Sequence, residues 1–273
     1  MKWWKTASVV FVLGLCLLLT GCPGKTPVSI AVVFTPYAVP NSDGTVIVYE
    51  LLLSDYRTKN LEMKTVEVFA DGALLRTYTD ADWLRDDYTA PVALIFPKEG
   101  AASEAEDACK QPVLYFAIPL TAGEKVPATL SHKIYFAKNA SKKAFSLAVE
   151  GGTASMNTEP LPVIAPPLRG SRMAITEAIS PRTHHRTGIS MIDGKPFISQ
   201  RFAIDYFQLT EQGTMAGGDP SINASYPGYG DDLLAVAPGK VVKIVCGVVD
   251  NETPPGRSMV ITNEIVGGNL VVI

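Results

Sequence analysis

The chain has 273 residues, of which 47% are hydrophobic and 19% charged, and its formal net charge is −3. This is the balance of an ordinary globular protein, and the lack of a basic patch argues against a nucleic-acid partner. The length is sufficient for two small domains.

A targeting segment opens the chain. Lys2 and Lys5 form a short basic region, and the apolar run that follows at residues 7–19 has the length of a signal-peptide core. The run ends in Leu19-Thr20-Gly21-Cys22, which resembles the lipobox of bacterial lipoproteins. We therefore expect residues 1–21 to be cleaved, Cys22 to be lipidated, and residues 22–27 to tether the protein to the periplasmic face of a membrane in the bacterial cell envelope.

The alternative for the same segment is a transmembrane anchor. The apolar run is shorter than the ~20 residues that a spanning helix needs, which favours the lipoprotein interpretation. Cys22 is followed by Pro23 and not by Asp, so nothing here argues for retention in the inner membrane. Both the inner and the outer membrane remain open.

Residues 28–159 read as a series of short β-strands. Two turn signals separate them, Asn41-Ser42-Asp43-Gly44 and the two-residue hairpin turn Asp71-Gly72. The spacing predicts an antiparallel sandwich, and we interpret the segment as an immunoglobulin-like module. His132 is expected on the surface of a strand. The predicted strands cover residues 28–34, 45–53, 66–70, 74–78, 113–118, 130–136 and 145–149, and residues 101–108 are expected in a helical or irregular loop.

A proline-rich linker follows at residues 160–171. Residues 160–167 contain four prolines in eight positions, which favours an extended spacer. Residues 172–273 then form a second β-rich module. In it we expect a hairpin at 190–198, a strand at 201–209, a loop at 213–230, a strand, turn and strand at 233–245, and last strands at 259–262 and 269–273. Phe202, Ile204 and Phe207 are expected to supply core.

Two of the four cysteines are expected in the folded part of the mature protein. Cys16 is lost with the signal peptide and Cys22 is the lipid site, so Cys109 and Cys246 remain. In an oxidising compartment these two either pair and join the two modules, or stay separate buried thiols.

Three blocks of the second module, at 200–206, 230–242 and 267–273, resemble the first half of the catalytic domain of lysostaphin/LytM-type zinc metallopeptidases. These enzymes cut the peptide cross-links of the bacterial cell wall. The family's first block is His-x-Gly-x-Asp. Asp205 matches its Asp, whereas Arg201 stands at the His and Ala203 at the Gly. The second and third blocks follow the family pattern at Gly230, Leu234, Ala235, Ala237, Gly239 and Val241, and at Gly268, Asn269, Val271 and Ile273.

The resemblance implies a zinc site of which little is present. In the family the ligands are the first His, the Asp, and the second His of a later His-x-His, and only Asp205 is in register here. A guanidinium has no lone pair for a metal, so we expect Arg201 to pair with Asp205 or another carboxylate. His184 and His185, upstream of the motif, are possible substitute ligands. The alternative is that both belong to a polar, basic loop.

The chain stops at Ile273, before the region in which the family carries His-x-His, and we expect a truncated reading frame or a fragment. The leading hypothesis is therefore a lipid-anchored envelope protein with a degenerate, incomplete peptidase-like domain, inactive and without a cofactor as it stands. Its partners would be the membrane through Cys22, and peptidoglycan or a wall hydrolase. One rival is a zinc endopeptidase with its remaining ligands beyond Ile273, and another is a sandwich that binds a partner beside a vestigial second module.

Overall fold

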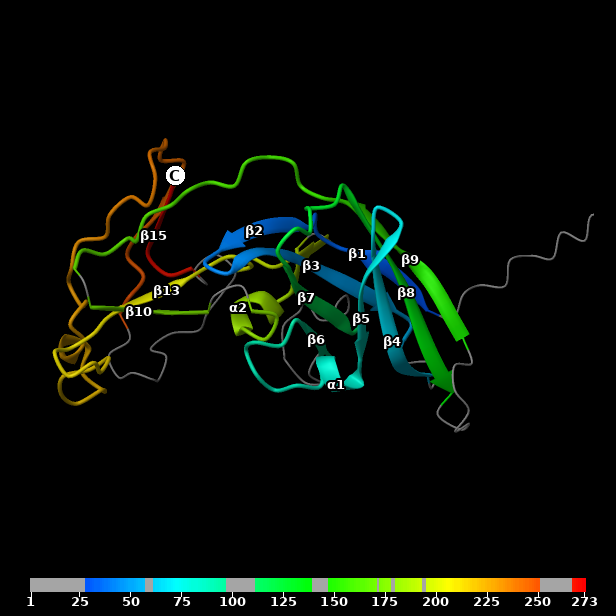
Figure 1. The fold of residues 1–273 in the computed structure, drawn as a ribbon. Helices are drawn as coiled ribbons and strands as arrows, with labels where there is room; N and C mark the ends of the chain where they lie inside the picture. The colour runs from blue at the N-terminus through cyan, green and yellow to red at the C-terminus, as the bar shows by residue number, and fades with distance from the viewer. Residues whose placement is uncertain are drawn as a thin grey trace, which may run out of the picture.

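The computed structural model of the chain describes residues 28–56, 61–96, 111–138, 147–170, 172–177, 180–192, 195–250 and 267–273. The regular structure in these ranges is predominantly β, and the strands pair antiparallel (Figure 1). The prediction of an all-β chain with antiparallel sheets is confirmed. The two α-helices of the described ranges, α1 (Asp80–Trp83) and α2 (His184–Thr187), have four residues each, and no helix there is long enough to cross a membrane.

The first sheet contains five strands in the order β1-β3-β7-β6, with β2 also paired to β3. Its strands are β1 (Ser29–Val32), β2 (Tyr37–Asn41), β3 (Gly44–Ser54), β6 (Val92–Ile95) and β7 (Val113–Leu120). β1 and β2 pair with successive parts of β3, and the predicted turn after Asn41 closes the β2–β3 hairpin. β2 itself was not expected from the sequence.

The second sheet has four strands in the order β5-β4-β8-β9. They are β4 (Leu61–Ala70), β5 (Ala73–Thr79), β8 (Thr129–Lys138) and β9 (Leu147–Ser155). The predicted two-residue turn joins β4 to β5, and both of its residues have positive φ, 49° at Asp71 and 82° at Gly72. This left-handed backbone suits an Asp-Gly turn, which follows the twist of the two strands.

The two sheets pack face to face around one core. Alternate residues of β3 (Ile47, Tyr49, Leu51 and Leu53) and of β7 (Leu114, Phe116, Ile118 and Leu120) enter this core, together with Val66, Val68, Leu130, Ile134 and Phe136 of the second sheet. The intervening residues of β3 and β7 therefore face away from the second sheet, because neighbouring side chains of a strand point to opposite faces. Val48, Glu50, Val113 and Tyr115 on this outer face are nevertheless buried, so another part of the chain covers it.

The expectation that His132 lies on the strand surface is wrong. Its side chain is buried, in phase with Leu130, Ile134 and Phe136 along β8. His132 Nε2 is 2.9 Å from the Tyr49 hydroxyl, and its Nδ1 is 3.1 Å from the Gly152 carbonyl oxygen. The alternation of side chains along β8 places His132 on the core face. Its two polar partners offset the free-energy cost of burying the imidazole ring.

The later part of the chain forms two-stranded pairs beside the two packed sheets (Figure 1). The pairs are β10 (Met173–Thr176) with β13 (Asp205–Gln208), β11 (Ser190–Ile192) with β12 (Lys195–Phe197), and β14 (Lys243–Val245) with β15 (Leu270–Val272). The hairpin expected at 190–198 is confirmed. The long loop after β13 contains the short 3₁₀ helix η2 (Asn223–Ser225).

The hairpin expected at 233–245 does not form, and only Lys243–Val245 is a strand. Leu234 donates its backbone N–H to Pro167 O and Val236 O accepts from Ala165 N, each at 2.8 Å. The backbone at 234–236 is thus bonded to the proline-rich segment, whose prolines lack the N–H groups for a regular ladder.

The strand expected at 201–209 begins only at Asp205, because turn hydrogen bonds from Arg201 N to Ile198 O and from Ala203 N to Gln200 O precede it. Phe202 and Ile204, expected in the core, are instead 41% and 37% exposed. The predictions for residues 1–27, including Cys22, for the 101–108 loop with nearby Cys109, and for the strand at 259–262 fall outside the described residues. Cys246 is exposed.

Candidate functional site

The short helix α2 carries His184 and His185, the two possible substitute ligands, and next to them Arg186. Thr183, extended at φ −68° and ψ 144°, precedes the helix, and Gly188 ends it. Thr187 Oγ1 donates to Thr183 O at 3.1 Å, and Thr183 Oγ1 donates to Ser180 O at 3.2 Å. Because successive helical residues point about 100° apart, His184, His185 and Arg186 face three different environments.

Arg186 points into the outer face of the first sheet and ends on Glu50. Arg186 Nη2 donates to Glu50 Oε1 at 2.6 Å, and both side chains are fully buried. The same guanidinium donates to the backbone carbonyls of Phe116 and Tyr49, at 3.1 and 3.3 Å. Burial lowers the pKa of Arg186 below its ordinary value, and the charge of Glu50 partly offsets this.

Arg201, which aligns with the family's first zinc ligand in the resemblance described above, reaches the same carboxylate. Its Nε donates to Glu50 Oε1 at 3.1 Å, and its Nη2 lies 2.7 Å from Glu50 Oε2. The second contact is an ion pair without hydrogen-bond alignment, since Oε2 accepts no hydrogen bond among the described residues. Arg201 also donates to the carbonyls of Thr35 and Val48, at 3.2 and 3.3 Å. The expected carboxylate partner of Arg201 is thus Glu50 and not Asp205.

Aromatic rings complete the surroundings of Arg201. Its guanidinium carbon lies 5.5 Å from the ring centre of Phe34, 5.4 Å from that of Tyr37 and 4.9 Å from that of Phe202. Guanidinium groups at such distances are attracted to the ring faces. Beside this cluster, Ile198 packs with Val113 and Tyr115, and Ile189 packs against them. Arg186, Ile189, Ile198 and Arg201 therefore cover the outer face of the first sheet.

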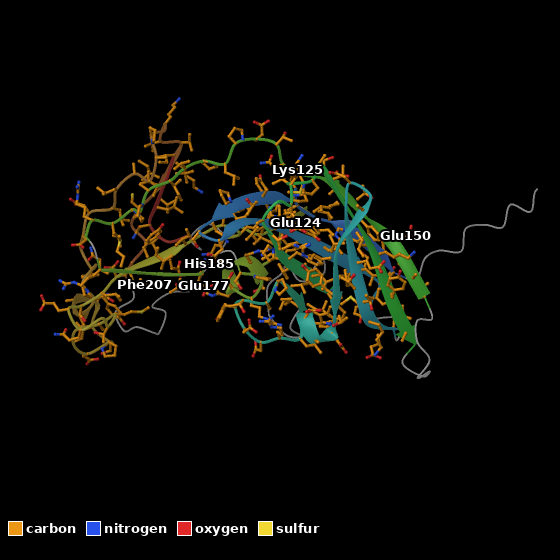
Figure 2. All side chains as sticks on the ribbon, viewed as in Figure 1. Glu124, Lys125, Glu150, Glu177, His185 and Phe207 are labelled. Carbon is orange, nitrogen blue, oxygen red and sulfur yellow. The ribbon has the colours of Figure 1, made fainter. Side chains whose placement is uncertain are left out.

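The structure places His185 close to Asp205, the retained family position for which His185 was named as a possible additional ligand. His185 Nε2 is 3.5 Å from Asp205 Oδ1. His185 is buried, with 3% of its side chain exposed, whereas 40% of the Asp205 side chain is exposed. Figure 2 shows His185 where the two packed sheets meet the β10–β13 pair.

The hydrogen bonds of His185 are made to neutral groups. His185 Nδ1 is 3.3 Å from Ala203 O, and His185 Nε2 is 3.1 Å from Gln200 Nε2. A carbonyl only accepts, so Nδ1 carries the proton and Nε2 accepts from the Gln200 amide, with the amide orientation and the tautomer assigned from this network. The lone pair that a metal would need is therefore already used by Gln200.

His184 belongs to a different pair. Its Nδ1 is 3.0 Å from Glu177 Oε1, its side chain is 73% exposed, and its ring meets the His185 ring edge-on at 4.7 Å between centres. Glu177, on the segment after β10, was not singled out from the sequence, where no spacing pattern links it to His184. Figure 2 labels Glu177 next to His185 at this junction.

The donor set does not fit a catalytic zinc. Such a site takes three protein ligands and keeps one position open, and no group of three or more His, Cys, Asp or Glu side chains in the described ranges could hold a metal ion. His185 and Asp205 supply two donors, His184 faces Glu177, and Arg201 is bound to Glu50.

A pocket of about 580 Å³ opens beside Asp205. Its walls come from the end of the proline-rich segment, from β13 and the residue before it, and from the long loop that follows. They are Pro167, Leu168, Ile204, Asp205, Tyr206, Phe207, Gln208, Met215, Tyr226, Gly228 and Leu233.

No family model, curated protein or solved structure matches the chain. The contacts of Glu50, Arg201, His185 and Asp205 are therefore the basis on which function is inferred. Sequence reasoning had singled out three of these four residues. It missed Glu50, although Glu50 is the one charged residue within the eleven residues of β3, and a lone charge in an otherwise apolar strand indicates a buried partner.

Proposed function

We propose that this chain is a lipid-anchored protein of the bacterial cell envelope that acts by binding, with a degenerate LytM-like module held against an immunoglobulin-like sandwich. Its partner is peptidoglycan or a wall hydrolase. The observation that carries the non-catalytic part is the position of Arg201, which stands where the peptidase family has its first zinc ligand and is bound to buried Glu50.

Glu50, Arg186 and Arg201 form a buried group that we call the Glu50 cluster. It supports this role for Arg201 because breaking it is costly in free energy. Removing one partner of a buried ion pair leaves the other charge without compensation, at a typical cost of about 3–5 kcal/mol. Glu50 is fully buried and Arg201 is 9% exposed. The guanidinium therefore stays on Glu50, and position 201 does not contribute to a metal site at Asp205.

Further contacts beside the Glu50 cluster support the proposal that the two modules act as one unit. Arg182 Nη2 donates to Trp83 O at 2.8 Å, and Ser180 Oγ donates to Tyr88 O at 2.6 Å. Together with Arg186 and Arg201 these contacts attach the later part of the chain to the first sheet and its neighbouring loops. A sandwich fixed in this way would hold the second module at a defined distance from a lipid on Cys22.

The anchoring part of the proposal is tested in a bacterial host by metabolic labelling with an alkyne-tagged fatty acid. Label should appear on the full chain and vanish in the Cys22→Ala variant, which should also leave the membrane fraction. Cys246→Ala is the matched control, and it should keep both label and membrane association. Unlabelled protein that still sediments with membranes would contradict the lipid anchor.

The binding part is tested with the detergent-solubilised lipoprotein and purified insoluble peptidoglycan. The protein should sediment with the wall material while releasing no soluble fragments, with or without added zinc. If the wall material does not retain the protein, a hydrolase partner remains, and crosslinking in the intact envelope followed by mass spectrometry should then identify a wall hydrolase. If neither result is obtained, the proposed function fails.

A second candidate is a zinc endopeptidase that cuts peptidoglycan cross-links, favoured by the 3.5 Å between His185 Nε2 and Asp205 Oδ1. Two donors bound to one tetrahedral zinc at ~2.1 Å would lie at a similar separation. This candidate needs further ligands from outside the described residues. It predicts wall fragments released in a zinc-dependent way and lost in His185→Ala, whereas the binding proposal predicts no fragments in either protein.

A further inference from the structure

The pocket between β13, the end of the proline-rich segment and the long loop has the size of a small-molecule site. Its volume is about 580 Å³, and ~300–1,000 Å³ is common for such sites. Among the described residues that line it there is no lysine, arginine or histidine. Its apolar wall comes from several separate segments of the chain, and consists of Pro167, Leu168, Ile204, Met215 and Leu233.

The strand β13 turns one of its faces toward this pocket. The Asp205 carboxylate lies toward His185, at 3.5 Å between Oδ1 and Nε2. Because neighbouring side chains of a strand point to opposite faces, Tyr206 and Gln208 share the other face. That face is the pocket side, since a Cβ added to Gly228, which also lines the pocket, would meet Gln208 Cγ at 3.3 Å.

Polar side chains at the pocket are engaged within the protein. Gln208 Nε2 donates to Arg169 O at 2.7 Å and to Asp231 Oδ2 at 3.1 Å, which uses both of its N–H groups. The Tyr226 hydroxyl donates to Pro220 O at 3.0 Å. With the Asp205 carboxylate on the other face of β13, a charged ligand would lose its hydration without an ion pair in return. The pocket therefore favours an uncharged ligand.

Two tyrosine rings line the pocket from different elements. Tyr206 belongs to β13, and Tyr226 directly follows η2 in the long loop. Neither ring contacts another aromatic ring in the described part of the chain, whereas Tyr49 and Tyr56 each pack against a phenylalanine. Aromatic rings attract one another beyond the effect of buried area, and the sulfur of Met215 is a further favourable neighbour for a ring.

We propose that this pocket binds an uncharged small molecule through a flat aromatic ring system, which lies against Tyr206, Tyr226 and the apolar side chains around them. The lack of a facing charge selects a neutral ligand, and the two tyrosine rings select an aromatic one. The inference goes beyond the proposed function and does not depend on it, because a small-molecule site in this module is compatible with any macromolecular partner.

The test uses the full chain in detergent, with protein-free micelles titrated as the blank. The ligands are 2-naphthol and decahydro-2-naphthol, which has the same ring carbons and hydroxyl without the aromaticity. Isothermal titration calorimetry should show about fivefold tighter binding of 2-naphthol, which corresponds to ~1 kcal/mol of aromatic attraction. The anion 2-naphthoate should bind more weakly than 2-naphthol. Equal affinity for 2-naphthol and either other compound, or no binding of any, would overturn the inference.

Substitution of the tyrosines locates the effect. The double variant Tyr206→Leu/Tyr226→Leu keeps an apolar pocket and should bind 2-naphthol no more tightly than decahydro-2-naphthol. Tyr229→Leu is the matched control and should keep the preference. Tyr229 is in the same loop but not in the described pocket lining, and like Tyr226 it donates its hydroxyl hydrogen, to Asp250 Oδ2 at 2.9 Å. A preference that survives the double variant, or that is lost in Tyr229→Leu, would refute the assigned site.

Tyr226→Phe separates the loss of a ring from a folding defect. It loses the hydrogen bond to Pro220 O and keeps the ring, so it should retain the preference for 2-naphthol. Loss of the preference in this variant would show that the loop conformation and not the ring controls binding, against the inference. Failure of the wall and crosslinking assays would refute the proposed function alone, and failure of the naphthol comparison would refute this inference alone.

Discussion

Arg201 Nη2 lies 2.7 Å from Glu50 Oε2, although the two residues are 151 positions apart in the chain. Glu50 belongs to the middle of β3, on the face opposite the shared core, and Arg201 belongs to the turn before β13. With Arg186 on the other oxygen, one carboxylate holds two guanidinium groups of the later module. Arg201 is thus a main attachment of the later part of the chain to the first sheet.

Arg201→Ala is expected to destabilise the protein by about 3 kcal/mol, the lower end of the range for breaking a buried ion pair, because Glu50 keeps Arg186. Urea unfolding followed by tryptophan fluorescence measures the change. Arg172→Ala is the matched control, since Arg172 is 3.8 Å from Glu211 and both side chains are largely exposed, and it should cost less than ~1 kcal/mol. Equal effects of the two substitutions would contradict the assigned role of the Glu50 cluster.

Arg201→His introduces the residue that the lysostaphin/LytM-type motif carries at this position, and the variant is expected to gain no zinc. The side chain at 201 lies against Glu50 and the carbonyls of Thr35 and Val48, so its carboxylate partner is Glu50 and not Asp205. Metal content by inductively coupled plasma mass spectrometry should match that of the wild type. Stoichiometric zinc in this variant, lost again on adding His185→Ala, would instead mean that positions 185, 201 and 205 can converge on one metal.

The stability of the sandwich is expected to fall in mild acid because of His132. Burial lowers the pKa of His132 from 6.5 to about 4, and its hydrogen bonds to the Gly152 and Gly151 backbone offset this only in part. Between these pH values the unfolded chain binds the proton and the folded chain does not, so this contribution is fully present above pH ~6.5 and decreases as the pH falls toward 4. At pH 4.5 the free energy of unfolding should be about 2 kcal/mol lower than at pH 7 from this group.

Urea unfolding at several pH values measures this loss, and His132→Gln is the control because it cannot titrate. The variant should be less stable than the wild type at pH 7 and should show a shallower decline toward pH 4.5. Parallel pH profiles for the two proteins would show that His132 does not carry the acid sensitivity.

The turn between β4 and β5 provides a test of backbone strain alone. Gly72 has φ +82°, and a Cβ added there would meet no atom within 4 Å. Gly72→Ala should therefore cost about 1 kcal/mol through the left-handed backbone and not through a clash. Gly72→Asn should cost less, because Asn tolerates this conformation better. Thermal unfolding compares the two, and an Asn variant that is the less stable of the pair would contradict this cause.

The sequence alone was sufficient where structure depends on neighbouring residues. The β-rich pattern predicted the strands of both packed sheets except β2 and β6, Asp71-Gly72 predicted the β4–β5 turn, and the run at 190–198 predicted the β11–β12 hairpin. These features follow from side chains alternating across a strand and from the few residues that accept positive φ.

Tertiary structure decided the rest, because it depended on which distant surfaces meet. β3 is apolar on both faces apart from Glu50, which indicates that its outer face is covered but not by which residues. Packing alone decided that the partners of Glu50 are Arg186 and Arg201. The pairing of residues 234–236 with residues 165–167 was decided in the same manner. A buried charge or an unpaired strand takes its partner from whatever the fold brings within hydrogen-bond distance, and that distance in space is independent of separation along the chain.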